Sequence, residues 1–226
     1  MIIGDGLISK EFKENYGDNE NIIIFASGVS NSEEKNPLNF LREKELLFKT
    51  LSEHTEKQII YFSTILIGFN TNQYYQHKKE MEDLIKENSK NYLIFRIPQI
   101  IGNNGNSNNL VNYLIDNIKD QKSFIAYDKV KRSIMDVKDV VNVVDYCVGK
   151  CHNEIIYISG LEMISVVDLV EKIGYILNVK PLCEIQEKEE VDGWDLLDSN
   201  IFKEYIIEMK INSNSYTERI LKNYIK

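Results

Sequence analysis

The chain has 226 residues, of which 43% are hydrophobic and 27% charged, values that are ordinary for a soluble globular protein and argue against disorder. Its 27 Lys and Arg residues against 35 Asp and Glu give a formal net charge of −8, which argues against broad nucleic-acid binding, because phosphate backbones are bound by basic surfaces. There is no apolar run of ~18 residues, no signal-peptide pattern and too few cysteines for a disulfide framework, so we expect a cytoplasmic protein outside the membrane.

Short apolar runs alternate with segments of helical spacing along most of the chain. The apolar runs are rich in Ile and aromatic residues and nearly continuous, as in strands that are buried on both faces of a parallel sheet. In chain order, the predicted strands are residues 1–4, 21–27, 58–64, 92–98 and 154–160. The predicted helices are residues 7–16, 40–54, 74–86, 110–118, 140–148 and 166–177, with a last helix near 215–225. This alternation predicts an α/β fold with right-handed crossovers.

The alternation stops after Val179, where an acidic stretch precedes the last helix. We therefore predict two parts in a single compact unit. Residues 1–160 would form the core with the parallel sheet and its flanking helices. Residues 161–226 would form a small C-terminal cap, folded onto the carboxyl ends of the strands.

A glycine-containing turn follows the first predicted strand. A strand that leads into G-x-G-x-x-G and then into a helix is the context in which this motif binds a dinucleotide. The first glycine permits the tight turn, the second lets the backbone approach a pyrophosphate, and the third position is the small residue Ser9. The predicted contacts come from Gly4, Asp5, Gly6, Leu7 and Ile8. The alternative is a strand-to-helix turn that needs glycine for its shape alone.

A second group of residues has the spacing of an acid–base relay. Ser63 and Thr64 end a predicted strand, and Tyr74 and Lys78 follow, four residues apart on one helix face. An ammonium beside a phenol favours the phenolate and lowers the phenol pKa from its usual ~10. The hydroxyl at the strand end can bind the substrate oxygen, so the group predicts proton transfer to a carbonyl or from a hydroxyl.

The neighbouring pair Tyr75 and Lys79 has the same spacing, so a register shifted by one residue is an alternative. A second alternative is a helix on the surface whose Tyr and Lys residues take part in no reaction. What favours Tyr74 is the order of the pieces: glycine turn, strand ending in Ser-Thr, Tyr-x-x-x-Lys, then a strand.

Seven short motifs in this order resemble the extended short-chain dehydrogenase/reductase superfamily. The closest likeness is to its NAD-dependent epimerase/dehydratase branch, which acts on nucleotide-activated sugars. It runs from Met1 to about Leu177. The motifs are Gly4-x-Gly6-x-x-Ser9, Phe25-Ala26-Ser27-Gly28, Tyr61-Phe62-Ser63-Thr64, Tyr74-x-x-His77-Lys78-x-x-x-Glu82, Arg96-x-Pro98-x-x-x-Gly102, the run Arg132 to Val140, and Ile158-Ser159-Gly160.

The resemblance implies a role for each matching residue. Thr64 would hold the substrate oxygen, Tyr74 would be the acid–base, and Lys78 would bind the nicotinamide ribose and tune Tyr74. The cofactor, NAD or NADP, would also contact Ala26, Ser27, Gly28, Ser63, Arg96 and Pro98. The nucleotide sugar would be bound by Arg132 and Gln99. The planar guanidinium of Arg132 can donate two parallel hydrogen bonds to a diphosphate. Glu82 would support the helix, and no metal is expected.

The chain departs from this pattern between residues 16 and 21, where the second and third strands of the family are absent. The remaining strands still form a contiguous sheet in the order 1-4-5-6-7. The adenosine half of the cofactor site loses its wall, so we predict weak binding and leave NAD and NADP both open. The first strand becomes a sheet edge, which a partner chain or the C-terminal tail would shield. A homodimer through residues 40–54 and 74–86 is the family's habit.

Ile65 and Leu66 follow Thr64, where dehydratases of the family carry an acidic pair, so we reject dehydration. The resemblance then implies an NAD(P)-dependent reductase or dehydrogenase for a keto or hydroxyl group of a nucleotide-activated sugar in surface-polysaccharide sugar biosynthesis. Two alternatives are an epimerase that retains its cofactor and a non-catalytic binding module that has lost activity.

Overall fold

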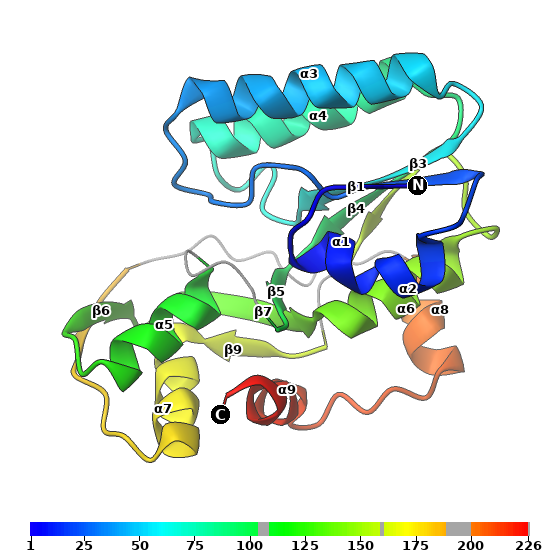
Figure 1. Ribbon diagram of the computed structural model, residues 1–226. Helices are drawn as coiled ribbons and strands as arrows, with labels where there is room; N and C mark the ends of the chain where they lie inside the picture. Colours follow the sequence, from blue (N-terminus) through cyan, green and yellow to red (C-terminus); the bar gives the residue numbers. More distant parts are fainter. Residues whose placement is uncertain (104–108, 159–160, 189–199, 226) are drawn as a thin grey trace.

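The computed structural model describes residues 1–103, 109–158, 161–188 and 200–225, and it is built around a five-stranded sheet (Figure 1). The strands are β1 (Ile2–Ile3), β2 (Ile22–Phe25), β3 (Gln58–Thr64), β4 (Tyr92–Ile97) and β8 (Glu154–Tyr157). They lie in the order β1-β2-β3-β4-β8, and every neighbouring pair is parallel. This is the contiguous, reduced sheet predicted from the sequence. Ser159 and Gly160 of the predicted motif lie outside the described residues.

Helices cover both faces of this sheet (Figure 1), which is why its strands are apolar throughout. One face carries α3 (Pro37–Glu53) and α4 (Gln73–Asn88). The other carries α1 (Leu7–Glu11), α2 (Lys13–Tyr16), α6 (Val137–Cys147) and α8 (Asn200–Glu208). The predicted single helix over residues 7–16 is wrong in one respect: it is divided into α1 and α2 at Phe12.

Asparagine side chains fix the starts of α3 and α4. Asn36 accepts a hydrogen bond of 3.1 Å from the N–H of Leu38, and Asn72 accepts one of 3.3 Å from the N–H of Tyr75. The cap at Asn72 places Tyr74 in the first turn of α4, and Lys78 follows one turn later on the buried side. The two caps therefore fix where α3 and α4 begin.

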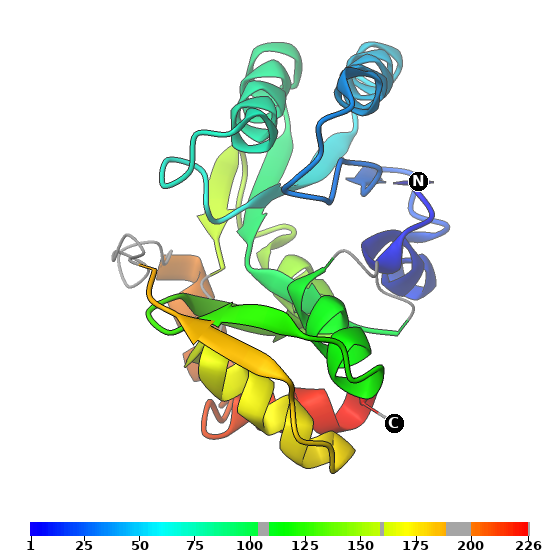
Figure 2. The ribbon, with the colours of Figure 1, turned by 90° about the vertical axis from the view of Figure 1, so that its left-hand side faces the viewer.

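A second lobe packs around a core of its own (Figure 2). It contains a three-stranded sheet of β5 (Gln99–Ile101), β7 (Lys131–Asp136) and β9 (Met163–Ser165), and a parallel pair of β6 (Phe124–Tyr127) and β10 (Cys183–Gln186). Its helices are α5 (Leu110–Lys119), α7 (Val166–Leu177) and α9 (Tyr216–Tyr224). The lobe thus draws on residues between 99 and 136 as well as on the segment after residue 160.

The edge of the main sheet is β1, which pairs only with β2 among the described strands and has two residues. Such a short edge exposes few unpaired backbone groups. The described part of the C-terminal tail lies elsewhere: α8 packs on α6 and β8, and α9 packs on β7 and α7. The tail between residues 200 and 225 therefore does not shield β1. None of the described helices is long and apolar enough to cross a membrane.

Candidate functional site

The glycine turn joins β1 to α1 at the carboxyl edge of the main sheet. Gly4 has a φ of +125°, and a Cβ there would lie 2.4 Å from the carbonyl oxygen of Ala26, so only glycine fits. At Gly6, a Cβ would meet nothing within 4 Å. The Ser9 hydroxyl donates a hydrogen bond of 2.9 Å to the Gly6 carbonyl and closes the first turn of α1. The space at Gly6 is therefore open, whereas Gly4 is packed against Ala26, directly after β2.

The turn after β2 connects the glycine turn to helix α4. Ala26, at its start, is the residue against which Gly4 packs. Gly28, at its end, lies against Lys78, because a Cβ on Gly28 would lie 2.5 Å from the Lys78 Nζ. One short turn therefore contacts both the predicted dinucleotide seat and the predicted acid–base helix.

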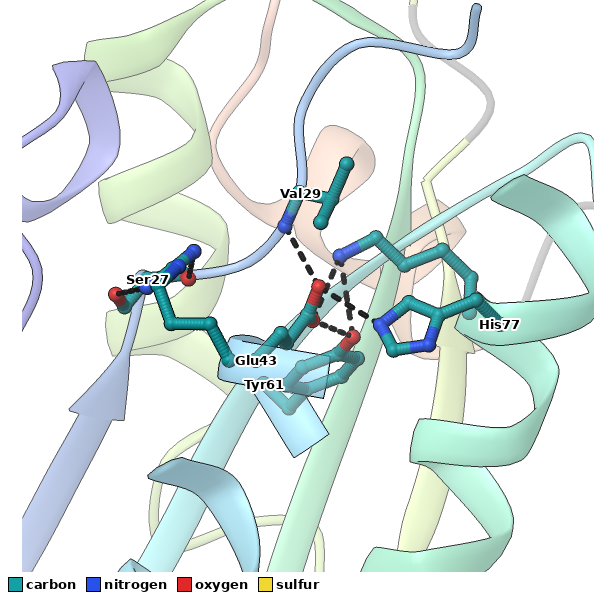
Figure 3. Close-up of polar contacts among 7 residues, drawn as sticks. Ser27, Val29, Glu43, Tyr61 and His77 are labelled. Carbon is teal, nitrogen blue, oxygen red and sulfur yellow. Dashed lines mark hydrogen bonds and ion pairs between the residues drawn. The ribbon is translucent and has the colours of Figure 1, made fainter. Parts of the chain in front are cut away.

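Beneath this turn is a buried polar network centred on Glu43 of α3 (Figure 3). Oε1 of Glu43 accepts hydrogen bonds from the Tyr61 hydroxyl at 2.6 Å and from the Lys78 ammonium at 3.0 Å. Oε2 accepts one from the N–H of Val29 at 2.6 Å and lies 3.0 Å from Nε2 of His77. Lys78 also donates to the Tyr61 hydroxyl at 3.1 Å. Residues from α4, from β3 and from the turn after β2 thus satisfy this carboxylate.

The network fixes a buried ion pair. Burial would raise the pKa of Glu43, but the charge of Lys78 and the hydrogen bonds with His77, Tyr61 and Val29 outweigh it, so the pKa lies well below its ordinary value. Burial, together with the charge of Glu43, raises the pKa of the Tyr61 phenol well above its ordinary value. Glu43 is therefore ionised and Tyr61 neutral, and the positive charge of Lys78 is matched by Glu43.

Tyr74 lies in the first turn of α4 and is 8% exposed. Its ring centre is 5.0 Å from that of Tyr75 and 5.9 Å from the Nζ of Lys78. Burial, and after it Tyr75 and Glu43, raise the pKa of Tyr74 above its ordinary value. This direction is opposite to the one expected from an ammonium beside a phenol, because burial disfavours the phenolate and the ammonium of Lys78 is paired with Glu43.

Two hydroxyls mark the end of β3. Thr64 is half-buried, and its Oγ1 accepts a hydrogen bond of 3.3 Å from the N–H of Leu66. Ser63 is 3% exposed, and its hydroxyl has no hydrogen-bond partner in the part of the chain that the structure describes. Buried hydroxyls are ordinarily hydrogen-bonded, so this one lacks, among the described residues, a partner that such groups usually have. Ile65, next along the chain, is a buried apolar residue.

Arg96, which the resemblance assigns to the cofactor, is bound by side chains of the protein. Its Nε and one terminal nitrogen donate to the two carboxylate oxygens of Glu82 at 2.8 and 2.6 Å. The other terminal nitrogen donates to the Tyr157 hydroxyl at 2.5 Å. Arg96 is 7% exposed and Glu82 0%. This bidentate pair ties α4 to β4 and explains both residues without a ligand.

The residues predicted to bind cofactor and substrate after β4 lie where the chain enters the second lobe. Pro98 stands between β4 and β5, and Gln99 begins β5 opposite Ile134 of β7. Arg132 lies two residues before Ile134 on the same strand and donates a hydrogen bond of 2.6 Å to the Lys131 carbonyl. Gln99 and Arg132 are therefore on adjacent strands of the three-stranded sheet. Thr64 lies at the end of β3, in the five-stranded sheet.

Glu43 was missed in the sequence, although a signal for it exists. Phe40, Leu47 and Leu51 form an apolar stripe at helical spacing on α3, and Glu43 lies on that stripe. A carboxylate on a buried face needs a partner, because burying an unpaired charge is unfavourable. The identity of the partner, Lys78, depends on how α3 and α4 pack and does not follow from the spacing.

Arg42 was missed as well. Its guanidinium donates to the hydroxyl of Ser27 at 3.0 Å and to the carbonyl of Ser27 at 2.8 Å, so it holds the middle of the turn after β2. The residue is exposed, and in the sequence it looks like any surface arginine on a helix. Only the fold shows that it lies at the candidate site.

The sequence matches no protein-family model, and no curated protein is similar to it. Solved structures, however, match the fold. UDP-glucuronic acid 4-epimerase from Bacillus cereus, in complex with UDP-glucuronic acid and NAD, has a TM-score of 0.69 at 13% identity, covering 96% of this chain and 77% of that one. UDP-glucose 4-epimerase from Thermotoga maritima, with UDP-glucose, has a TM-score of 0.69 at 14% identity, covering 96% and 80%.

A third match is dTDP-glucose 4,6-dehydratase from Bacillus anthracis, in complex with NAD, with a TM-score of 0.66 at 14% identity, covering 98% of this chain and 77% of that one. The chain has the fold of these enzymes. The predicted resemblance is thereby confirmed at the level of the fold, which is what identities this low can show. The chain covers 77% to 80% of the three structures, so it is a reduced version of that fold.

Proposed function

We propose that the protein is an NAD(P)-dependent oxidoreductase acting on a keto or hydroxyl group of a nucleotide-activated sugar. The observation that supports this most is the turn over residues 26–28, which contacts Gly4 at one end and Lys78 at the other. It brings a glycine turn with open space and a Tyr-x-x-x-Lys helix to one edge of a parallel sheet. Ligands of open α/β sheets bind at that edge.

The residues present fit the phosphate part of a dinucleotide. The open space at Gly6 would accept a phosphate, and the unpartnered hydroxyl of Ser63 would bind a polar group of the same ligand. When bound, a nicotinamide cofactor supplies or accepts the hydride. The adenosine half would find no strand beyond β1, the edge of the sheet, so we infer weak binding. NAD and NADP both suit the residues that remain.

The chain's own groups would handle the substrate oxygen and its proton. Thr64 would hold the oxygen by a hydrogen bond, and Tyr74 would exchange a proton with it. Lys78, held by Glu43, would keep the turn over residues 26–28 in place against α4. Arg132 would attract the diphosphate of the nucleotide.

A nucleotide-sugar epimerase is the second candidate, because several solved proteins with this fold are 4-epimerases. An epimerase uses the same groups without net redox change, and it must retain the reduced cofactor between its two half-reactions. The edge position of β1 favours the reductase, since a cofactor without an adenosine wall exchanges readily.

We also propose that the protein forms a homodimer through α3. Three apolar side chains of this helix are strongly exposed: Leu38 by 67%, Leu41 by 48% and Phe48 by 52%. Residues three and seven apart lie on one helix face, so they form a stripe on the side of α3 that faces away from the sheet. A second copy would remove this stripe from water.

A direct test is a panel of nucleotide-linked 4-ketosugars with NADH and NADPH, followed at the nicotinamide absorbance. We expect net oxidation of the cofactor by the wild-type protein, and loss of it in Tyr74→Phe. Tyr75→Phe is the matched control, because it removes the neighbouring hydroxyl in the alternative register. Sugar epimerisation without net cofactor oxidation would select the epimerase. Binding of a nucleotide sugar without any turnover would instead select a non-catalytic module.

A further inference from the structure

Glu43 is a charged residue on the buried face of α3. A buried carboxylate is unfavourable unless it is paired and hydrogen-bonded. The hydroxyl of Tyr61, the N–H of Val29, the ring of His77 and the ammonium of Lys78 all lie within 2.6 to 3.0 Å of it (Figure 3). A glutamine could retain part of this hydrogen bonding, but it could not balance the charge of Lys78.

Lys78 is the cation that lies over the ring of Tyr74. Only 3% of the residue is exposed, so water does not screen its charge. Its Nζ lies 5.9 Å from the ring centre of Tyr74 and 3.0 Å from the Glu43 carboxylate. A lone ammonium at that distance from a phenol would favour the phenolate. Paired with Glu43, it presents little net charge to Tyr74.

The other groups that face Tyr74 do not replace this cation. Tyr75 and Lys78 come from its own helix, Glu43 from α3 and Tyr61 from β3. Two of these are neutral phenols, and the other two form an ion pair without net charge. Burial then decides the ionisation of Tyr74, and it favours the neutral phenol.

We propose that Glu43 is a positioning residue that fixes and neutralises Lys78, so that Tyr74 remains a neutral phenol throughout the neutral pH range. In this state Tyr74 gives a proton to the substrate but does not accept one from it. The Tyr74 O–H bond breaks, an O–H bond forms on the substrate, and the phenolate recovers a proton from water. Within the proposed function, on which this last step rests, Glu43 directs the site toward carbonyl reduction. The protonation state of Tyr74 is independent of that function.

The test is a spectrophotometric titration that follows tyrosinate absorbance in the protein without added ligand. The wild type and Glu43→Gln are each compared with the same protein carrying Tyr74→Phe, so that the difference isolates Tyr74. We expect Tyr74 to ionise at least about one pH unit lower in Glu43→Gln than in the wild type, because the ammonium is no longer paired. Glu45→Gln, on the exposed side of α3, is the matched control and should leave the titration unchanged.

A double variant keeps the test valid if Glu43→Gln does not fold. Glu43→Gln with Lys78→Met removes both charges, and the proposal expects Tyr74 to titrate as in the wild type. Ionisation of Tyr74 in the wild type at or below the ~10 of free tyrosine would overturn the proposal. An unchanged midpoint in a folded Glu43→Gln protein would do so as well. Because no substrate or cofactor enters the titration, its result stands even if the sugar panel shows no turnover.

Discussion

The Arg96 guanidinium donates to both oxygens of Glu82 inside the fold, and neither side chain reaches much water. Removing one partner of a buried ion pair leaves an uncompensated charge, which typically costs about 3–5 kcal/mol. We expect Glu82→Gln to lower the free energy of unfolding by about 3 kcal/mol in urea denaturation.

The matched control for that change is Glu53→Gln. Glu53 forms a comparable pair with Lys49 on the surface of α3, at 3.8 Å, with side chains that are 56% and 69% exposed. Exposed pairs contribute little, so the free energy of unfolding should change by less than about 0.5 kcal/mol. Equal losses of unfolding free energy in the two variants would show that the pair with Glu82 does not stabilise the fold. Arg96 would then again be a candidate for contact with the cofactor.

The residues of the candidate site were predictable only in part. The four-residue spacing of Tyr74 and Lys78 is a local property, and the structure places both on the buried side of α4 as that spacing indicates. The partner of Lys78 was not predictable, because Glu43 lies on another helix, 35 residues earlier. The expected effect of Lys78 on Tyr74 therefore took no account of the burial of Tyr74 or of the charge of Glu43, both of which raise the Tyr74 pKa.

At the scale of elements, long periodic segments were predicted well and short ones were not. The strand Gln58–Thr64 and the helix Val166–Leu177 have the predicted bounds, because burial on both faces and a Ser165 cap leave clear patterns. In the second lobe, β5 and β9 have three residues each, too few to show a period. Their pairing comes from tertiary contacts, and this is why no sheet was predicted there.

The two glycines of the glycine turn have different predicted roles: Gly4 shapes the backbone, and Gly6 leaves space for a ligand. Gly4 has a positive φ and no room for a Cβ, so Gly4→Ala should lower the free energy of unfolding by about 1–3 kcal/mol. Gly6 has a φ of −75° and open space, so Gly6→Ala should fold with nearly wild-type stability.

A methyl group at Gly6 would occupy the space predicted for the dinucleotide phosphate. Titration calorimetry with NADH and NADPH should therefore show at least about a tenfold weaker affinity for Gly6→Ala, which corresponds to about 1.4 kcal/mol. If a folded Gly6→Ala protein binds both dinucleotides as tightly as the wild type, the open space at Gly6 is not the phosphate seat.

At the scale of the whole molecule, the strand order explains how a reduced sheet remains stable. The strands that are missing relative to the resembled family would lie beyond β1, so their absence shortens the sheet at one end and interrupts no pairing. The new edge is a strand of only two residues, and α3 and α4 still cover one face of the sheet while α6 and α8 cover the other. The reduction therefore affects the adenosine half of the proposed site and leaves the core and the acid–base helix intact.

The exposed stripe on α3 is what a second copy would cover. A lysine in place of Phe48 would put a charge into the apolar stripe, where an unpaired charge is strongly unfavourable once a second copy covers it. We expect light scattering at micromolar concentration to give the mass of a dimer for the wild type and of a monomer for Phe48→Lys. Tyr175→Lys is the matched control, because Tyr175 is 81% exposed on α7 in the other lobe, and it should remain dimeric. A monomeric wild type would exclude the dimer, and dissociation of both variants alike would place the interface elsewhere.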